Sequence, residues 1–105
     1  MAILKVLGEA VSATAVAAQT AVDLDSVTPF IVGGAAISTV VLTGVTGAPV
    51  IKVQTSPDNS TWTDAVSVSA TTNSVVLDEI VLQRYVRLNV TTAGTAGTVA
   101  AYLSV

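Results

Sequence analysis

The stretch VIKVQTSPDNSTWTDAVSVS, residues 50–69, decides the fold class. Apolar and polar side chains alternate from Ile51 to Gln54. Ile51 and Val53 therefore lie on one side and their polar neighbours on the other, as in a strand with one buried and one wet face. Pro57 sets the φ angle that suits the second position of a β-turn, and Asn59 tolerates the left-handed conformation that closes a hairpin. The stretch predicts two antiparallel strands joined by a turn whose role is structural rather than catalytic.

The same alternation of strand and turn signals continues from residue 19 to the end of the chain. Val and Thr are abundant, and these β-branched residues lose side-chain freedom in a helix but pack well on a pleated sheet. We expect strands at 20–24, 28–32, 37–43, 50–55, 61–69, 74–82, 85–92 and 98–105. Short strands at intervals of about 8–12 residues are typical of an antiparallel sandwich or barrel. We predict an all-β fold, a single antiparallel and jelly-roll-like β-sandwich over residues 19–105 with an N-terminal arm.

The expected arm, residues 1–18, is rich in alanine and lacks clean alternation. Alanine favours a short helix over 9–18, whereas Val11, Thr14 and Val16 weaken it. An extended arm has two possible roles, and the sequence leaves both open. It either packs on a neighbouring subunit or forms an edge segment of its own domain.

Two expected strands, 37–43 and 74–82, are apolar on both faces. In the first, Val41 opposes Val40 and Leu42; in the second, Val75, Leu77 and Val81 oppose Val76, Ile80 and Leu82. A strand of this kind needs cover on both sides, and large exposed apolar patches usually mark contacts. We expect a homo-oligomer, with the arm as the alternative cover within the chain. The candidate interface residues are Ile3, Leu4, Val6, Leu7, Val40, Leu42, Val76, Ile80, Leu82, Tyr85 and Arg87.

Composition argues against several classes of function. The chain has 105 residues, with no histidine, no cysteine, four basic and seven acidic residues. A net charge of −3 argues against nucleic-acid binding, which depends on cations at phosphates. Without histidine or cysteine there is no catalytic triad, disulfide framework or thiolate metal site, so we expect neither an enzyme nor a cofactor. The uncharged stretch 26–51 contains prolines and several glycines, which suit strands and turns better than a membrane span.

The carboxylates and arginines give only weak candidate sites. Carboxylate pairs that could be part of a calcium site occur at Asp23-x-Asp25 and Asp78-Glu79, and Asp58-Asn59 is a third, weaker candidate. None of them comes with the further oxygen ligands that calcium requires. We expect them to be solvated turn residues. Arg84 and Arg87 are expected to form ion pairs with Asp78 or Glu79, or with an acidic partner.

Three stretches together carry a resemblance: VIKVQTSPDNSTWTDA at 50–65, RYVRLNVTTAGTAGTVAAYLSV at 84–105 and TAVDLDSVTPFIV at 20–32. A strand, a Ser-Pro-Asp-Asn-Ser-Thr-Trp hairpin, an Arg-Tyr-Val-Arg strand and a final hairpin resemble the small β-sandwich virion structural proteins of tailed bacteriophages. The resemblance implies a particle component. A capsid decoration, or cement, protein on the capsid surface fits best, one that binds the major capsid protein and often forms trimers.

Other functions stay open. A tail, neck or fibre component is the alternative within the particle. Related hairpins also occur in discoidin-like carbohydrate-binding sandwiches, but this chain lacks the extra exposed aromatic residues and long loops of a sugar platform. A carbohydrate-binding adhesion module is therefore the weaker alternative.

Overall fold

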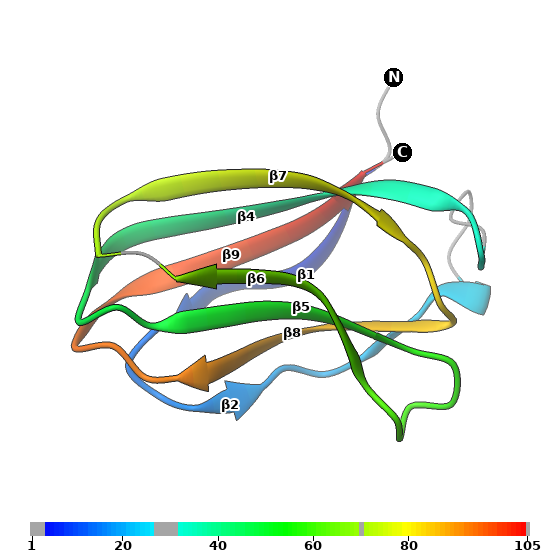
Figure 1. The fold of residues 1–105 in the computed structure, drawn as a ribbon, viewed down its shortest axis with the longest axis horizontal. Coiled ribbons are helices and arrows are strands. Elements are labelled where there is room, and N and C mark those ends of the chain that lie inside the picture. Colours follow the sequence, from blue (N-terminus) through cyan, green and yellow to red (C-terminus); the bar gives the residue numbers. More distant parts are fainter. Residues whose placement is uncertain (1–3, 27–31, 70, 105) are drawn as a thin grey trace.

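The computed structural model describes residues 4–26, 32–69 and 71–104, which form two facing antiparallel sheets (Figure 1). Sheet A contains, in spatial order, β1 (Leu4–Ser12), β9 (Ala96–Ser104), β4 (Ala35–Thr46) and β7 (Ser74–Val81). Sheet B contains β2 (Ala17–Ala18), β8 (Tyr85–Thr92), β5 (Val50–Ser56) and β6 (Thr63–Ser69). The short β3 (Val22–Asp23) also pairs with β8, and a 3₁₀ turn, Leu24–Ser26, follows it.

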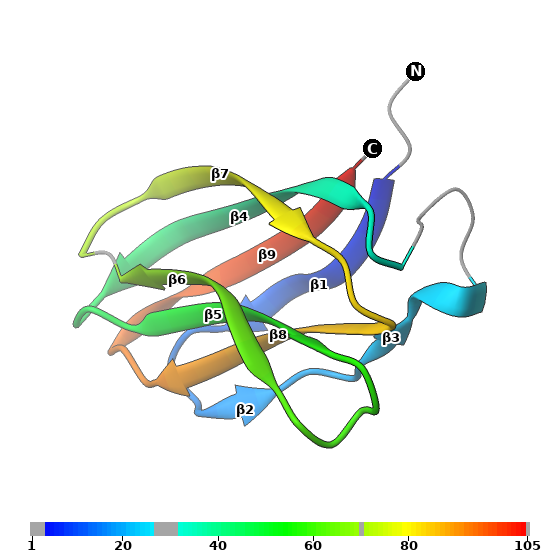
Figure 2. The same ribbon diagram turned by 45° about the vertical axis from the view of Figure 1, so that its right-hand side comes forward.

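The chain crosses between the two sheets after almost every strand, which Figure 2 shows most clearly for β1 to β2, β4 to β5 and β8 to β9. Among the described strands, only β5 and β6 form a hairpin within one sheet. Sheet A has four strands and sheet B has five, because β2 and β3 both pair with β8, and layers connected in this order make a jelly roll. The predicted all-β antiparallel sandwich is confirmed.

The hairpin at residues 50–69 has the predicted form. β5 and β6 pair antiparallel from Val50–Ser69 to Thr55–Thr63, with a bulge beside Val53. Asn59 has a φ of 62°, the left-handed conformation that its amide side chain tolerates. The strand expected at 85–92 has those limits, whereas the one expected at 20–24 is reduced to two residues and a 3₁₀ turn. The strand expected at 28–32 lies largely outside the described residues.

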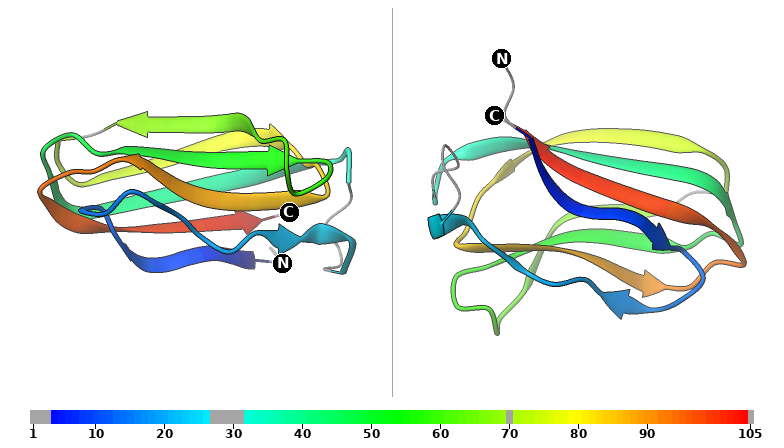
Figure 3. Two further views of the ribbon diagram at one scale, coloured as in Figure 1. Left: turned by 90° about the horizontal axis from the view of Figure 1, so that it is seen from below. Right: turned by 180° about the vertical axis from the view of Figure 1, so that it is seen from behind.

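The N-terminal segment packs as an edge strand of its own sandwich. β1 pairs with β9 along the edge of sheet A (Figure 3), and β2 then crosses to sheet B. The alternative of a helix over 9–18 is wrong. The register of β1 shifts on both sides of Gly8, and Ala10 has a φ of 54°. These bulges break the alternation that would have marked a strand.

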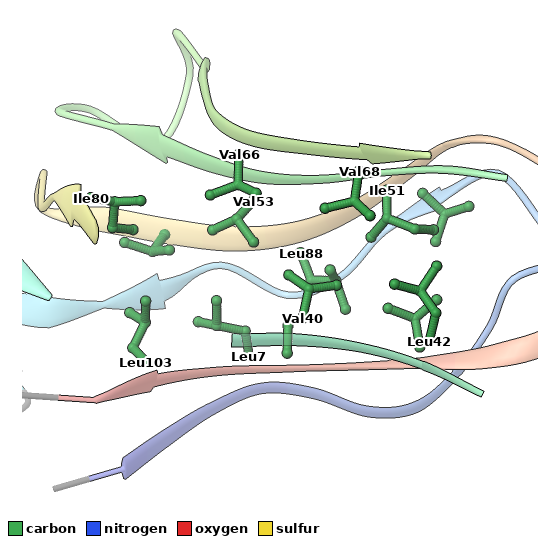
Figure 4. Packing of buried hydrophobic residues seen from close by; sticks show 14 of the residues in the cluster. Leu7, Val40, Leu42, Ile51, Val53, Val66, Val68, Ile80, Leu88 and Leu103 are labelled. Atoms are coloured by element: carbon green, nitrogen blue, oxygen red, sulfur yellow. The ribbon is translucent and has the colours of Figure 1, made fainter. Parts of the chain in front are cut away.

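The core fills the space between the sheets. Figure 4 shows Val40 and Leu42 of β4 and Leu103 of β9 facing Ile51, Val53 and Leu88 of sheet B. Each of these six side chains is at most 1% exposed. Burying one such side chain contributes about 1.5–3 kcal/mol, so this cluster supplies the main driving force for folding.

Candidate interaction surfaces

The outer face of sheet A carries five of the seven exposed large hydrophobic side chains in the described residues. Val75, Leu77 and Val81 of β7 are 60%, 63% and 67% exposed. Their neighbours on the same face are Ile37 and Val41 of β4, Tyr102 of β9 and Val6 of β1, because the paired rows run Val6–Tyr102–Thr39–Leu77 and Ala100–Val41–Val75. We call these seven residues the apolar face. Among the outward positions of β7, β4 and β9, the one charged side chain is that of Glu79.

Most of the interface residues expected from the sequence lie in the core instead. Leu7, Val40, Leu42, Ile80 and Leu82 are between 1% and 5% exposed. Val76 is half-buried against the same cluster. A buried side chain cannot contact a second molecule, so the expectation for these residues is corrected. The sequence identified β4 and β7 as apolar on both sides, but alternation alone does not reveal which side points inward.

The remaining candidates are divided among different surfaces. Val6 belongs to the apolar face and is 41% exposed. Ile3 lies outside the described residues, and the backbone of Leu4 pairs with Ser104 at the start of β1. Tyr85 and Arg87 lie on the opposite side of the molecule, on the outer face of sheet B. The structure therefore does not bring the predicted interface residues together in one patch.

A polar network covers the outer face of sheet B. Lys52 Nζ lies 2.6 Å from Asp64 Oδ2, and Gln54 Nε2 donates to Asp64 Oδ1 at 2.8 Å. Gln54 Oε1 accepts from Arg87 Nε at 2.9 Å and from Asn89 Nδ2 at 3.1 Å. The hydrogen bonds of Lys52 and then Gln54 hold the pKa of Asp64 below its usual value. The donors and acceptors of this network satisfy one another, which favours a structural role.

The acidic pair Asp23 and Asp25 is held by an arginine. Arg84 Nη2 lies 3.1 Å from Asp23 Oδ2, and Arg84 Nε lies 3.3 Å from Asp25 Oδ2. The hydrogen bond from Arg84 lowers the pKa of Asp23, and Asp23 in turn raises the pKa of Arg84. The expected partners Asp78 and Glu79 are thus wrong for Arg84. Its guanidinium takes the place that a calcium ion would need beside this pair.

The turn after β5 is held by Asp58. Its Oδ1 accepts hydrogen bonds from the backbone N–H groups of Thr61 at 2.8 Å and Ser60 at 2.9 Å, and from Ser56 Oγ at 3.0 Å. Thr61 first, then Ser60 and Ser56, lower the pKa of Asp58. The carboxylate is engaged in holding the turn, as its predicted structural role requires.

The described part of the chain offers few other kinds of site. Its residues form no group of three or more metal-ligating side chains. None of its helices is long and apolar enough to cross a membrane. A shallow hollow lies between the edges of the two sheets, lined by Thr55, Thr63, Glu79, Val81 and Gln83 among others. The surface with the strongest physical signal is therefore the apolar face.

Comparison with known proteins supports the fold. No protein-family model and no curated protein matches the sequence. The structure is similar to the crystal structure of PBSX exported protein XepA, with a TM-score of 0.63 and 17% sequence identity. The match covers 97% of this chain and 36% of the XepA chain, so this chain spans about a third of that protein. At this identity the likeness shows a shared sandwich fold.

Proposed function

We propose that this chain is a non-enzymatic structural protein of a phage particle that attaches to other proteins through the apolar face. The observation that carries the proposal is the exposure of Val75, Leu77 and Val81, each at least 60%, on one side of sheet A. An exposed row of aliphatic side chains is costly in water, and a contiguous patch of this kind usually marks a protein contact.

The structural comparison gives a second, coarser support. XepA is a phage-related protein, and its likeness to this chain covers nearly the whole sandwich. The sequence resemblance to small virion proteins, which depends on the hairpin at 50–65 and the strand at 84–92, favours the same setting. Fold likeness alone does not carry a function from one protein to another, so the role depends on the apolar face.

Within the particle, we propose a capsid decoration protein that binds the major capsid protein on the capsid surface and forms a homo-oligomer, a trimer by resemblance. Its action is passive. Apolar area buried on several shell subunits holds the head together, and contacts that are individually weak add up when one oligomer engages several sites. Neither nucleic acid nor a membrane is part of this proposal.

Particles carrying variants of this protein test the proposal. Leu77→Lys places a charge in the middle of the apolar face and is expected to abolish incorporation into virions. The matched control, Thr61→Lys, places the same charge on an exposed turn outside that face and is expected to incorporate normally. Mass spectrometry of purified particles measures the copy number, and electron microscopy locates the copies.

The location separates the alternatives. Copies spread over the head in hundreds support the decoration role, whereas a few tens of copies on a tail, neck or fibre replace it with the alternative particle role. Absence from the particle, or equal incorporation of both variants, overturns the proposed function.

A further inference from the structure

The two edges of sheet A carry charges of opposite sign at inward-pointing positions. Lys5 of β1 pairs with Leu103, and Asp78 of β7 pairs with Ser38. Leu103 and Ser38 are buried at 0% and 1% exposure, so Lys5 and Asp78 lie on the inner side of the sheet at its two rims. Each is accessible to solvent because an edge strand has a neighbour on one side only.

These edge charges have no partner among the described residues, whereas the other cations do. Lys52 pairs with Asp64, Arg84 pairs with Asp23, and Arg87 donates to Gln54. In residues 4–26, 32–69 and 71–104, neither Lys5 nor Asp78 forms an ion pair. Within the described ranges, Asp78 and its neighbour Glu79 place two unpaired carboxylates on β7 and Lys5 places an unpaired cation on β1. Glu9, the other charged residue of β1, lies beyond the bulge at Gly8.

The strand directions allow these two edges to meet. Each neighbouring pair in the order β1-β9-β4-β7 is antiparallel, so β7 runs opposite to β1. A second copy placed beside the first in the same orientation brings its β1 antiparallel to β7. The row Val6–Tyr102–Thr39–Leu77 crosses the whole sheet. Continuing that row into the next copy sets Val6 against Leu77, and the next residue pair is then Lys5 against Asp78.

We propose that copies of this protein associate by pairing β7 of one copy with the Leu4–Val6 part of β1 of the next. In this register an ion pair forms between Lys5 and Asp78 on one side of the joined sheet. On the other side, Val6 and Leu77 make an apolar contact. The inference depends on the oligomer named in the proposed function and identifies the two surfaces that form it.

The charges select this contact over the symmetric ones. Inward-pointing charges on edge strands commonly protect a sheet from pairing with other chains. Two copies of β7 side by side would bring Asp78 and Glu79 of both copies together. Two copies of β1 joined through Leu4–Val6 would bring two lysines together, because Glu9 lies beyond the bulge at Gly8. Among contacts through the regular Leu4–Val6 part of β1, only β1 against β7 matches opposite signs, so the two different edges attract each other.

The shapes of the two edges agree with a short, specific contact. β7 keeps an unbroken register with β4 from Ala35–Val81 to Leu42–Ser74 and contains no proline. β1 is regular from Leu4 to Val6 and bulges on both sides of Gly8. The bulges limit pairing with another strand to the first three residues of β1. A head-to-tail contact either closes into a ring or continues as a filament, with neighbouring apolar faces adjoining.

A charge swap in purified protein tests the ion pair. Sedimentation at low salt is expected to show an oligomer for the natural chain. Lys5→Glu and Asp78→Lys are each expected to raise the dissociation constant at least about tenfold, because like charges then oppose each other. The combined Lys5→Glu/Asp78→Lys protein is expected to associate like the natural chain. Circular dichroism confirms that each variant folds. A monomeric natural chain, or a double variant that fails to recover, overturns the inference.

Cysteine cross-linking tests the register, since the chain has no cysteine of its own. Residues directly opposite each other on paired strands are close enough for a disulfide. A mixture of Val6→Cys and Leu77→Cys proteins is expected to form mixed dimers on oxidation, and neither protein alone is expected to do so. Self-linked Leu77→Cys dimers would replace this contact with a symmetric one. Both experiments use purified protein without virions. The protein can therefore associate with itself even if it is not incorporated into the particle, and it can be incorporated even if it does not associate through this contact.

Discussion

The guanidinium carbon of Arg87 lies 4.1 Å from the centre of the Trp62 ring. The edge of the same guanidinium donates from Nε to Gln54 Oε1 at 2.9 Å. Trp62 closes the hairpin that joins β5 to β6, and Arg87 lies on β8, so the contact fixes the hairpin to a third strand. It also covers one face of the chain's single tryptophan.

This contact predicts a measurable coupling. In a double-mutant cycle with Trp62→Ala and Arg87→Ala, the two losses in free energy of unfolding are expected to be non-additive by about 0.5–1 kcal/mol. Urea denaturation followed by circular dichroism gives the four values. The matched control is the double-mutant cycle of Arg84 and Tyr85. The guanidinium carbon of Arg84 lies 5.1 Å from the centre of the Tyr85 ring, and the Arg84 side chain is 45% exposed. Equal coupling in both cycles would contradict the assignment.

Gly97 is predicted to be the glycine least tolerant of a side chain. Its φ is 107°, and an added Cβ would lie 2.5 Å from the Cα of Val45 and 2.6 Å from its nitrogen. Gly97→Ala is expected to lower the free energy of unfolding by about 3 kcal/mol or more, because backbone strain and overpacking add.

Gly44 is the control for this prediction. Its φ is 66°, but an added Cβ would have nothing within 4 Å. Gly44→Ala is therefore expected to cost only about 1–2 kcal/mol, the conformational part alone. Thermal unfolding of both variants measures the difference. Similar losses would show that the approach of Val45 does not matter.

The sequence predicted the parts of the fold that local chemistry determines. The alternation around Ile51 and the turn chemistry of Asn59 depend only on near neighbours, and the hairpin formed as predicted. The alternation in β4 divides its apolar residues between two faces, with Val40 and Leu42 on one face and Ile37 and Val41 on the other. Which face is buried depends on where the second sheet lies, and no local signal contains that information.

Contacts between distant residues were beyond prediction for the same reason. Arg84 and Asp23 are separated by 61 positions and meet because β3 pairs with β8. For residues 1–18 the sequence left an edge segment as one of several alternatives, because the bulges of β1 shift the register twice within nine residues. The signal for the apolar face was present in the sequence, as strands apolar on both sides, but it identified the strands and not their outward residues.

Two buried serines are predicted to respond in opposite ways to replacement by alanine. Ser38 is 1% exposed and its Oγ has no hydrogen-bond partner among the described residues, whereas Ser56 is 0% exposed and donates to Asp58. Ser38→Ala is expected to leave the free energy of unfolding unchanged or raise it by up to about 1 kcal/mol, because an unpaired buried hydroxyl is removed. Ser56→Ala is expected to lower it by about 1–2 kcal/mol.

Chemical denaturation of the two alanine variants at neutral pH decides this prediction. The variants remove the same atom from equally buried sites, so they differ only in the hydrogen bonds lost. A loss at Ser38 as large as that at Ser56 would mean that the Ser38 hydroxyl contributes a stabilising contact in solution.

Acid is predicted to weaken the fold through its paired carboxylates. The N–H groups of Thr61 and Ser60 lower the pKa of Asp58 below the ordinary 3.8, as Arg84 does for Asp23 and Lys52 for Asp64. When the folded-state pKa is lower than the unfolded one, the unfolded chain binds more protons in the interval between them. The stabilisation is therefore complete above the unfolded value and is lost as the pH falls through the folded value.

The midpoint of urea unfolding is accordingly expected to stay level from about pH 7 to pH 5 and to fall as the pH drops below 3.8. Asp58→Asn is expected to be less stable at neutral pH and to lose less on acidification, because its amide cannot gain the charge that Thr61 and Ser60 stabilise. Glu79→Gln, on the exposed part of β7, is the matched control for the loss of one carboxylate outside this turn. An unfolding midpoint that rises in acid would have the wrong sign for hydrogen bonds that favour the ionised carboxylate, and would show that Asp58 holds its turn in another way.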